Sequence, residues 1–208
     1  MKHIIIAGPP RAGKSSLAKR LSEEFGYFVI SIDKLVAVFG AAYPQLDIRL
    51  NWDRDKTTDN IAPFIGHFLG IFSSADGRGL LPYSHGAIPG NRFVLEGGYL
   101  DWDRISSVLD RYGYGISEWR EQFLLIGLVQ NKKTVDELVT DFKTYDTPDD
   151  WTYGMGDSDL KDVADDVLSS GKTMADSLTA QGFTVYDTSA AREQVWKRII
   201  ESIQSEPV

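Results

Sequence analysis

Cysteine and long apolar runs are both missing from this chain. None of its 208 residues is cysteine, which excludes disulfide bonds, thiolate nucleophiles and zinc sites built on sulfur. No apolar run approaches the roughly 18 to 20 residues that a helix needs to span a bilayer. The opening residues MKHIIIAG also lack the pattern of a secretory signal. We therefore expect a cytoplasmic protein without a membrane partner.

Arginine is missing from residues 121–191, and negative charge is concentrated in the same region. Residues 136–166 hold eleven carboxylates against two lysines, so this segment accounts for the whole net charge of −8. Such a surface repels the phosphate backbone of nucleic acids, and we expect no nucleic-acid partner. Two interpretations stay open for the segment itself, a solvated acidic face or a lid-like insertion.

Strand and helix patterns alternate along the chain. Residues 3–7 are a short apolar run with three isoleucines, typical of a central strand that is buried on both faces. Residues 15–25 carry apolar side chains every four positions and end before Gly26, which predicts a helix. Further strands are predicted at residues 27–32, 92–95, 123–129 and 183–186, and a last helix follows the fifth strand.

Residues 8–15, GPPRAGKS, have the spacing of a phosphate-binding loop. Its glycines let backbone N–H groups point inward, and the following helix adds the positive end of its dipole. Lys14 suits the β- and γ-phosphates, and the Ser15 hydroxyl suits Mg²⁺. The sequence therefore predicts that a nucleoside triphosphate is held by Gly8, Pro9, Pro10, Arg11, Ala12, Gly13, Lys14, Ser15 and Ser16.

The loop and the alternation together predict an α/β fold of the P-loop NTPase type. We expect a three-layer α/β/α sandwich whose five-stranded parallel sheet has the order 2-3-1-4-5. At 208 residues the chain fits one domain with two insertions. The first insertion, about residues 45–91, holds a predicted helix and then a loop rich in glycine and proline. The second, about residues 131–166, is acidic and lid-like.

Two classes that share this loop fit the rest of the sequence poorly. A GTPase reads guanine with Asn-Lys-x-Asp, but residues 131–134 read NKKT and place Thr134 where the carboxylate belongs. A motor ATPase has an apolar strand ending in acid together with an arginine finger, and FVLE at residues 93–96 matches only loosely.

A third class, the small-molecule kinases, is matched by several segments. The loop GPPRAGKS resembles the GPPGAGKG and GPSGAGKS loops of nucleoside monophosphate kinases, with Arg11 where those often carry glycine. RFVLEGGYL resembles the strand ending in Asp-Gly of adenylate kinases, and VISID resembles the second strand of shikimate kinase and chloramphenicol phosphotransferase. TVYDTS is similar to the ending of these kinases, where the loop borders the adenine. The resemblance follows the order of elements along nearly the whole chain.

The resemblance implies a phosphotransferase that uses ATP and Mg²⁺. Asp33 matches the position that faces the acceptor hydroxyl, where it would orient the acceptor and accept its proton. Glu96 would hold magnesium through water or orient Asp33. We expect Lys14, Asp33 and Glu96 to be catalytic, and Ser15 and Glu96 to hold the metal. The open alternatives are a helix N-cap for Asp33 and a turn carboxylate for Glu96.

The acceptor follows from the missing arginines, because nucleotide kinases of this kind grip the phosphoryl group with lid arginines. Their absence favours an acceptor with a hydroxyl and less negative charge, such as a nucleoside, sugar or other metabolite. Arg49, Arg54 and Arg78 leave a nucleoside monophosphate kinase as an alternative, and a regulatory P-loop ATPase is a second one. His85 is a candidate substrate contact, and Trp151 a candidate to close over the substrate. We expect a monomer or a homodimer.

Overall fold

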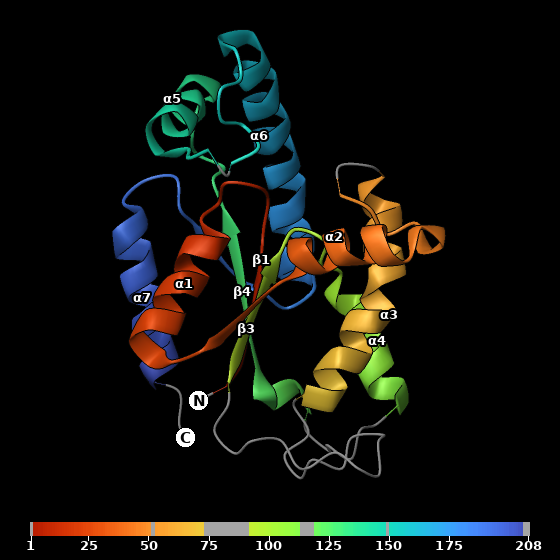
Figure 1. The fold of residues 1–208 in the computed structure, drawn as a ribbon. Helices are drawn as coiled ribbons and strands as arrows, with labels where there is room; N and C mark the ends of the chain where they lie inside the picture. Colours follow the sequence, from red (N-terminus) through yellow and green to blue (C-terminus); the bar gives the residue numbers. More distant parts are fainter. Residues whose placement is uncertain (1, 51–52, 73–91, 113–118, 149, 206–208) are drawn as a thin grey trace. The chain divides into compact units, whose positions relative to one another are not determined.

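The computed structural model describes residues 2–50, 53–72, 92–112, 119–148 and 150–205. The chain forms a five-stranded parallel sheet with the order β2-β3-β1-β4-β5, flanked by helices (Figure 1). The strands are β1 (His3–Ala7), β2 (Phe28–Ser31), β3 (Phe93–Gly97), β4 (Phe123–Val129) and β5 (Thr184–Asp187). The predicted fold class and strand order are confirmed.

The helices are α1 (Lys14–Phe25), α2 (Ile32–Ala42), α3 (Arg54–Phe72), α4 (Trp102–Tyr112), α5 (Val135–Tyr145), α6 (Asp157–Ala180) and α7 (Arg192–Ser205). Two short 3₁₀ helices, η1 (Pro44–Leu46) and η2 (Trp119–Gln122), complete the described elements. Among the described residues, no helix combines the length and the apolar character needed to cross a bilayer.

Contacts divide the chain into two compact units. Among the described residues, the first unit contains residues 2–7 and those within 14–126, and the second contains Gly8–Gly13 and those within 127–205. The phosphate loop is therefore shared, with residues 8–13 in the second unit and Lys14 in the first. Each unit is described by itself below, and the single domain stays a prediction.

The first unit is built on β1, β2 and β3. Ile4, Ile5 and Ile6 are fully buried, as expected for a strand covered on both faces. The parallel register pairs Glu96 of β3 with Ile6 of β1 and with Ser31 of β2. Helices α3 and α4 lie side by side in the same unit (Figure 1). The register places the carboxyl ends of all three strands at one edge, beside Glu96.

The second unit contains α5 and α6, which carry the acidic insertion. Buried apolar side chains from both helices form one cluster, made of Leu138, Val139, Phe142, Leu160, Ala164 and Val167. The helix α5 begins with a capping box, in which the Thr134 side chain accepts from Glu137 N and the Glu137 side chain accepts from Thr134 N. The acidic insertion is thus a packed helical pair with a hydrophobic interior of its own.

The structure corrects several predicted boundaries. The strands β1 and β4 have the predicted bounds, but β2 is shorter than residues 27–32 because Ile32 already begins α2. The strand β3 extends past residue 95 to Gly97, so Glu96 lies inside the strand and not in a turn after it. The first insertion contains the predicted helix as α3, whose apolar side chains are only partly buried. Phe64 is 38% exposed and packs edge-on against Phe39, with ring centroids 4.5 Å apart.

Candidate functional site

Lys14 is the first residue of α1 and is buried, with 8% of its surface exposed. Burial lowers the pKa of its ammonium group, because desolvation penalises the charged form. The negative charges of Asp33 and Glu96 oppose that shift, and Arg54 adds to it. These electrostatic effects come from three charged side chains on separate elements, Asp33 of α2, Glu96 of β3 and Arg54 of α3.

Ser15 and Glu96 lie in hydrogen-bond contact. The Ser15 hydroxyl donates to Glu96 Oε2 at 3.1 Å, and Glu96 is only 4% exposed. Among the described residues there is no group of three or more His, Cys, Asp or Glu side chains that could hold a metal. A magnesium site needs no such group, because Mg²⁺ is commonly held by one or two carboxylates plus substrate phosphates and water. The donor set of Ser15 and Glu96 fits that ion.

Asp33 lies in the first turn of α2, and its Oδ1 accepts a hydrogen bond from Gly98 N at 3.4 Å. The alternative that Asp33 is the N-cap is wrong, because Ser31 holds that position. Gly97 permits the approach of the two segments: a Cβ there would lie 2.7 Å from Ile32 Cβ and 3.4 Å from Asp33 Oδ1. The helix start that carries Asp33 therefore packs directly on the end of β3.

Arg54 begins α3 and reaches the same edge of the first unit. Its Nη2 donates to the carbonyl oxygen of Gly98 at 2.7 Å. Gly98 thus takes a hydrogen bond from Arg54 and gives one to Asp33. The sequence had named Arg54 as one of three insertion arginines that suit an anionic acceptor. The structure brings it near Lys14 and Asp33, leaves Arg49 paired with Asp47, and does not describe Arg78.

In the second unit, glycine is required at both ends of loop residues 8–13. Gly8 has φ +153°, and a Cβ there would lie 2.1 Å from the carbonyl oxygen of Leu128. Gly13 has φ +92°, and a Cβ there would lie 3.2 Å from the Trp196 ring. Both positions combine an unusual backbone conformation with a close neighbour, so the loop shape depends on these two residues.

Thr188 anchors the loop, and sequence reasoning assigned it no role. Its buried hydroxyl lies 3.0 Å from the carbonyl oxygen of Ala12 and 3.1 Å from that of Val129, and its N–H donates to Val129 O at 2.8 Å. From the sequence, TVYDTS was only similar to the ending of a kinase. Asp187 accepts from Ser189 N at 2.8 Å, a contact within the turn that follows β5.

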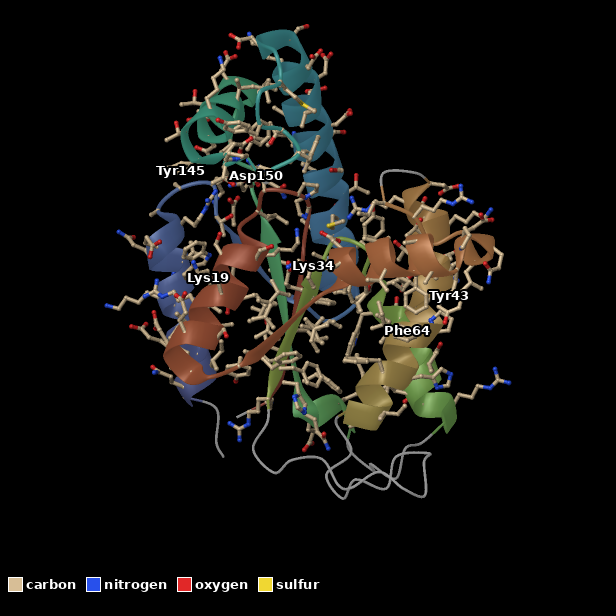
Figure 2. All side chains as sticks on the ribbon, viewed as in Figure 1. Lys19, Lys34, Tyr43, Phe64, Tyr145 and Asp150 are labelled. Carbon is tan, nitrogen blue, oxygen red and sulfur yellow. The ribbon has the colours of Figure 1, made fainter. Side chains whose placement is uncertain are left out.

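Arg11 has a backbone conformation that is unusual for a residue with a side chain. Its φ is +66°, in the left-handed region that favours glycine. Its guanidinium forms ion pairs with Asp146 and with Asp150, the latter at 2.6 Å, and lies 5.2 Å from the centre of the Phe142 ring. The loop is thereby tied to the segment between α5 and α6, where Figure 2 labels Asp150.

The carboxylates of the acidic segment fall into two groups. Asp136 and Asp157 have side chains that are 82% and 77% exposed, in agreement with a solvated face. Asp146, Asp141 and Asp150 have side chains that are 5%, 22% and 31% exposed, and each pairs with a cation. Asp141 pairs with both Lys133 and Arg192. The less exposed carboxylates are therefore neutralised and do not form a bare negative surface.

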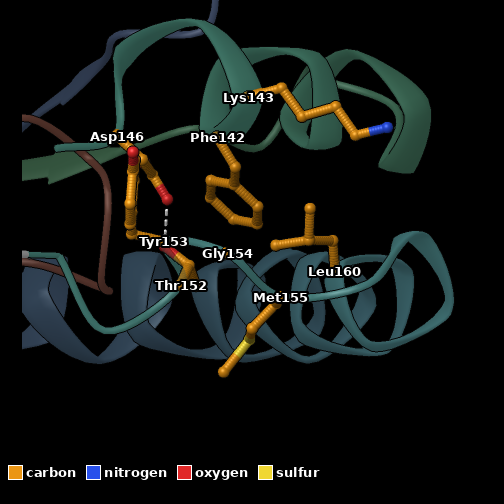
Figure 3. Close-up of a pocket in the computed structure, with 8 residues that line it drawn as sticks. All are labelled: Phe142, Lys143, Asp146, Thr152, Tyr153, Gly154, Met155 and Leu160. Atoms are coloured by element: carbon orange, nitrogen blue, oxygen red, sulfur yellow. Dashed lines mark hydrogen bonds between the residues drawn. The ribbon is translucent and has the colours of Figure 1, made fainter. Parts of the chain in front are cut away.

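A cavity of about 220 Å³ lies within this helical pair (Figure 3). Phe142 and Leu160 face each other across it, and Asp146 lies at one end, where it accepts a hydrogen bond from Thr152. Trp151 is 52% exposed and does not line this cavity. Its predicted closure over a substrate stays a prediction, and His85 lies outside the described residues.

Trp102, Trp119 and Trp196 are buried, as expected for packing residues. His3 stacks on Phe93 with ring centroids 4.1 Å apart, and burial lowers its pKa to about 4. Ser16 is exposed in the first turn of α1. None of these side chains adds a titratable group to the site.

Comparison with known proteins identifies the architecture. No protein-family model and no curated protein matches the chain. A shikimate kinase from Bacteroides thetaiotaomicron is similar in structure, with a TM-score of 0.54 and 15% identity over 98% of each chain. The chain has the fold of P-loop small-molecule kinases.

Two further structures support the same fold. A shikimate kinase from Acinetobacter baumannii in complex with shikimate has a TM-score of 0.53 and 14% identity, covering 99% of this chain and 94% of its own. A sugar kinase from a Janibacter species has a TM-score of 0.52 and 14% identity, covering 100% and 96%. At such identities the likeness is one of fold, so the reaction has to be argued from the side chains.

Proposed function

We propose that this protein is an ATP- and Mg²⁺-dependent phosphotransferase that moves the γ-phosphate of ATP to a hydroxyl group of a small metabolite. The observation that carries the proposal is the gathering of Lys14, Asp33 and Glu96 in the first unit, where both carboxylates act on the charge of Lys14. Phosphoryl transfer needs positive charge at the phosphate oxygens and an acceptor group held in line, and this set of side chains offers both.

The residues have distinct roles in the proposed reaction. Backbone N–H groups within residues 8–13, of which Pro9 and Pro10 supply none, bind phosphate oxygens, and the Lys14 ammonium places its charge on the β- and γ-phosphates. Ser15 and Glu96 would hold Mg²⁺, which neutralises charge on the phosphates when it is bound. The lowered pKa of Lys14 makes a phosphate partner favourable, because the charged form of a buried ammonium needs an anion nearby.

Asp33 would orient the acceptor hydroxyl and accept its proton. Its Oδ1 takes the hydrogen bond from Gly98 N, which fixes the carboxylate and leaves Oδ2 for an acceptor. A base must lie within hydrogen-bond reach of the proton that it removes, and the influence of the Asp33 charge on the phosphate-binding Lys14 supports this role.

Arg54 keeps a nucleoside monophosphate kinase as the second candidate. Its guanidinium lies at the same edge as Asp33, since both contact Gly98, and it acts on Lys14. An arginine there suits an acceptor that carries a carboxylate or a phosphate as well as a hydroxyl. A sugar without an anionic group would form no ion pair with Arg54. A screen for the acceptor should therefore contain both neutral and anionic metabolites.

The deciding experiment is a screen of metabolite pools for acceptor-dependent release of ADP. With the acceptor in hand, Asp33→Asn should lower turnover about 100-fold or more, because general-base catalysis contributes roughly 10²–10⁴. ATP affinity should stay unchanged in that variant, since the Gly98 hydrogen bond can be kept by the amide oxygen. Lys14→Ala should instead weaken ATP binding strongly.

Asp101→Asn is the matched control, because Asp101 also accepts from a backbone N–H, that of Arg104 at 3.1 Å, but is not one of the charges that act on Lys14. Unimpaired turnover in Asp33→Asn would remove Asp33 as the base. Slow ATP hydrolysis that no metabolite stimulates and a protein partner does would favour the regulatory ATPase instead.

A further inference from the structure

Arg11 is held by two carboxylates that have other hydrogen-bond donors of their own. Its Nη1 contacts Asp150 Oδ1 at 2.6 Å, and its Nη2 contacts Asp146 Oδ1. The second oxygen of Asp150 accepts from Thr147 N at 2.9 Å and from Thr147 Oγ1 at 3.0 Å. The second oxygen of Asp146 accepts from Thr152 Oγ1. Both carboxylates therefore stay anchored by local donors if the guanidinium leaves.

The backbone of residue 11 also indicates a role for the side chain. A left-handed conformation costs an L-residue roughly 1–2 kcal/mol, and glycine adopts it without that cost. The chain nevertheless carries arginine at φ +66° in the middle of the phosphate loop. Strain of this kind at a candidate site points to a function of the side chain, because glycine would serve the loop shape better.

Positive charge near the transferred phosphate is needed, and arginine, which binds phosphate through two N–H groups, is scarce in the second unit. No arginine occurs between residues 121 and 191. Lys133 and Arg192 both pair with Asp141. Arg11 belongs to the loop itself, so a phosphate bound by the loop amides would lie within reach of its long side chain. The guanidinium is planar and binds a phosphate through the same two-pronged geometry that it uses for a carboxylate.

We propose that the Arg11 guanidinium contacts the terminal phosphate of bound ATP, and that Asp146 and Asp150 compete with that phosphate for it. The inference rests on the proposed function, since it requires the loop to bind ATP. It assigns the acidic segment a definite part in the reaction: its less exposed carboxylates hold an arginine that the phosphate can take over. Arg11 would then be a catalytic residue, because it contacts the group that is transferred.

The test compares binding of Mg·ATP and Mg·ADP by isothermal titration calorimetry. Arg11→Met should weaken ATP binding roughly 10- to 100-fold, the range expected for losing a hydrogen bond between charged groups. ADP binding should change less than about twofold, because ADP lacks the terminal phosphate. Arg11→Lys, which keeps the charge and loses the two-pronged geometry, should give an intermediate loss for ATP and serves if the methionine variant does not fold.

Variants of Asp146 and Asp150 distinguish two roles for these carboxylates: competition with phosphate for Arg11, or ion pairs that only stabilise the loop. Asp150→Asn and Asp146→Asn weaken the hold on Arg11 and keep an oxygen for the local threonines, so each should bind ATP several-fold more tightly and ADP as before. Ion pairs that only stabilise the loop predict the opposite sign, with weaker ATP binding in the Asp and Arg11 variants alike. That result, or equal losses for ATP and ADP in Arg11→Met, would overturn the inference.

Two controls match the substituted residues. Arg20→Met removes an arginine that pairs with Glu24 in α1, and Asp157→Asn removes a carboxylate of the same acidic segment that pairs with Lys143. Neither should alter the ratio of ATP to ADP affinity. If the wild-type protein bound no ATP, or Lys14→Ala bound it normally, the proposed function would fail as well. A normal Lys14 effect with an unchanged Arg11→Met would reject this inference alone.

Discussion

Lys14 and Arg11 are cations three positions apart in one loop motif, yet their surroundings differ. Lys14 is buried at the start of α1 in the first unit, and two carboxylates from β3 and α2 act on its charge. Arg11 belongs to the second unit, is partly exposed, and pairs with the segment between α5 and α6. The position of the lysine follows from the loop motif, whereas the partners of the arginine follow from tertiary contacts. Substitutions can test separately the loop residues 8–13, which include Arg11, and the surroundings of Lys14.

Gly8→Ala should have the largest effect, because it should distort loop residues 8–13, which include Arg11. The new Cβ would lie 2.1 Å from a backbone oxygen, that of Leu128, and the backbone must shift to relieve it. We expect a loss of about 3–5 kcal/mol in the free energy of unfolding, as for other severe steric or backbone conflicts, and no measurable ATP binding. Chemical denaturation and calorimetry measure the two effects.

Gly156→Ala is the matched control for that substitution. The nearest atom to a Cβ there is Asp159 Oδ2 at 3.8 Å, and the φ of −69° suits any residue. If both variants lost stability equally, the steric account of Gly8 would be wrong.

Glu96→Gln tests the surroundings of Lys14. The substitution keeps an oxygen for the Ser15 hydroxyl and removes the charge that suits Mg²⁺. We expect acceptor-dependent ADP release to fall about 100-fold, in the range seen when one charge-stabilising group is lost, and more Mg²⁺ to be needed for half-maximal turnover. Titrating Mg²⁺ in steady-state assays measures this.

Glu24→Gln, at a carboxylate that pairs with Arg20 within α1, should leave the Mg²⁺ dependence unchanged. A normal magnesium response in Glu96→Gln would show that Glu96 does not hold the metal.

Thr188→Val should loosen loop residues 8–13 without a clash. The carbonyl oxygen of Ala12 loses the hydroxyl that lies 3.0 Å away, whereas that of Val129 keeps the hydrogen bond from the N–H of residue 188. Leaving a buried acceptor without a donor costs about 1–3 kcal/mol. ATP binding should weaken together with stability.

Thr179→Val serves for comparison, because the exposed Thr179 hydroxyl donates to Ala175 O within α6. It should cost little. A Thr188 variant as stable as this one would mean that the hydroxyl does not anchor the loop.

The pH dependence of stability tests His3 of β1, a residue of the first unit that lies outside the loop. The His3 pKa is lowered from 6.5 to about 4 by burial first and by Arg92 second. The unfolded chain therefore binds the proton first, and stability falls as the pH drops from about 6.5 towards 4. Allowing for partial exposure of the ring, we expect a loss of about 1 kcal/mol by pH 5.

His3→Phe should flatten that part of the stability profile, and urea unfolding between pH 7 and 5 measures the difference. Equal slopes in the variant and the wild type would mean that the His3 pKa is not lowered in the folded protein.

The elements whose sequence pattern is local were predicted well. The run HIIIA is apolar on both faces and gave the bounds of β1. The roles of Lys14 and Ser15 follow from the spacing of the loop and stay predictions. The start of α2 was misplaced. The sequence Ser31-Ile32-Asp33 fits the end of a strand followed by an N-cap as well as it fits an N-cap followed by the first turn of a helix. Only the approach of β3 at Gly97 reveals that Asp33 is already inside the helix.

The partners of Arg11 could not be predicted in the same way. Asp146 and Asp150 lie more than 130 positions away in the chain, and nothing in their spacing separates them from the exposed carboxylates around them. Thr188 is similar, since both of its acceptors are main-chain atoms that leave no trace in the sequence.

The exposed residues of the acidic segment allow a spectroscopic probe to be attached at one site. Asp157 has a side chain that is 77% exposed, and Tyr145 at the end of α5, labelled in Figure 2, is 68% exposed. Because the chain contains no cysteine, a single cysteine placed at residue 157 would be the only thiol in the molecule. One fluorophore attached there would report on the segment while nucleotide is titrated, with no background labelling to subtract.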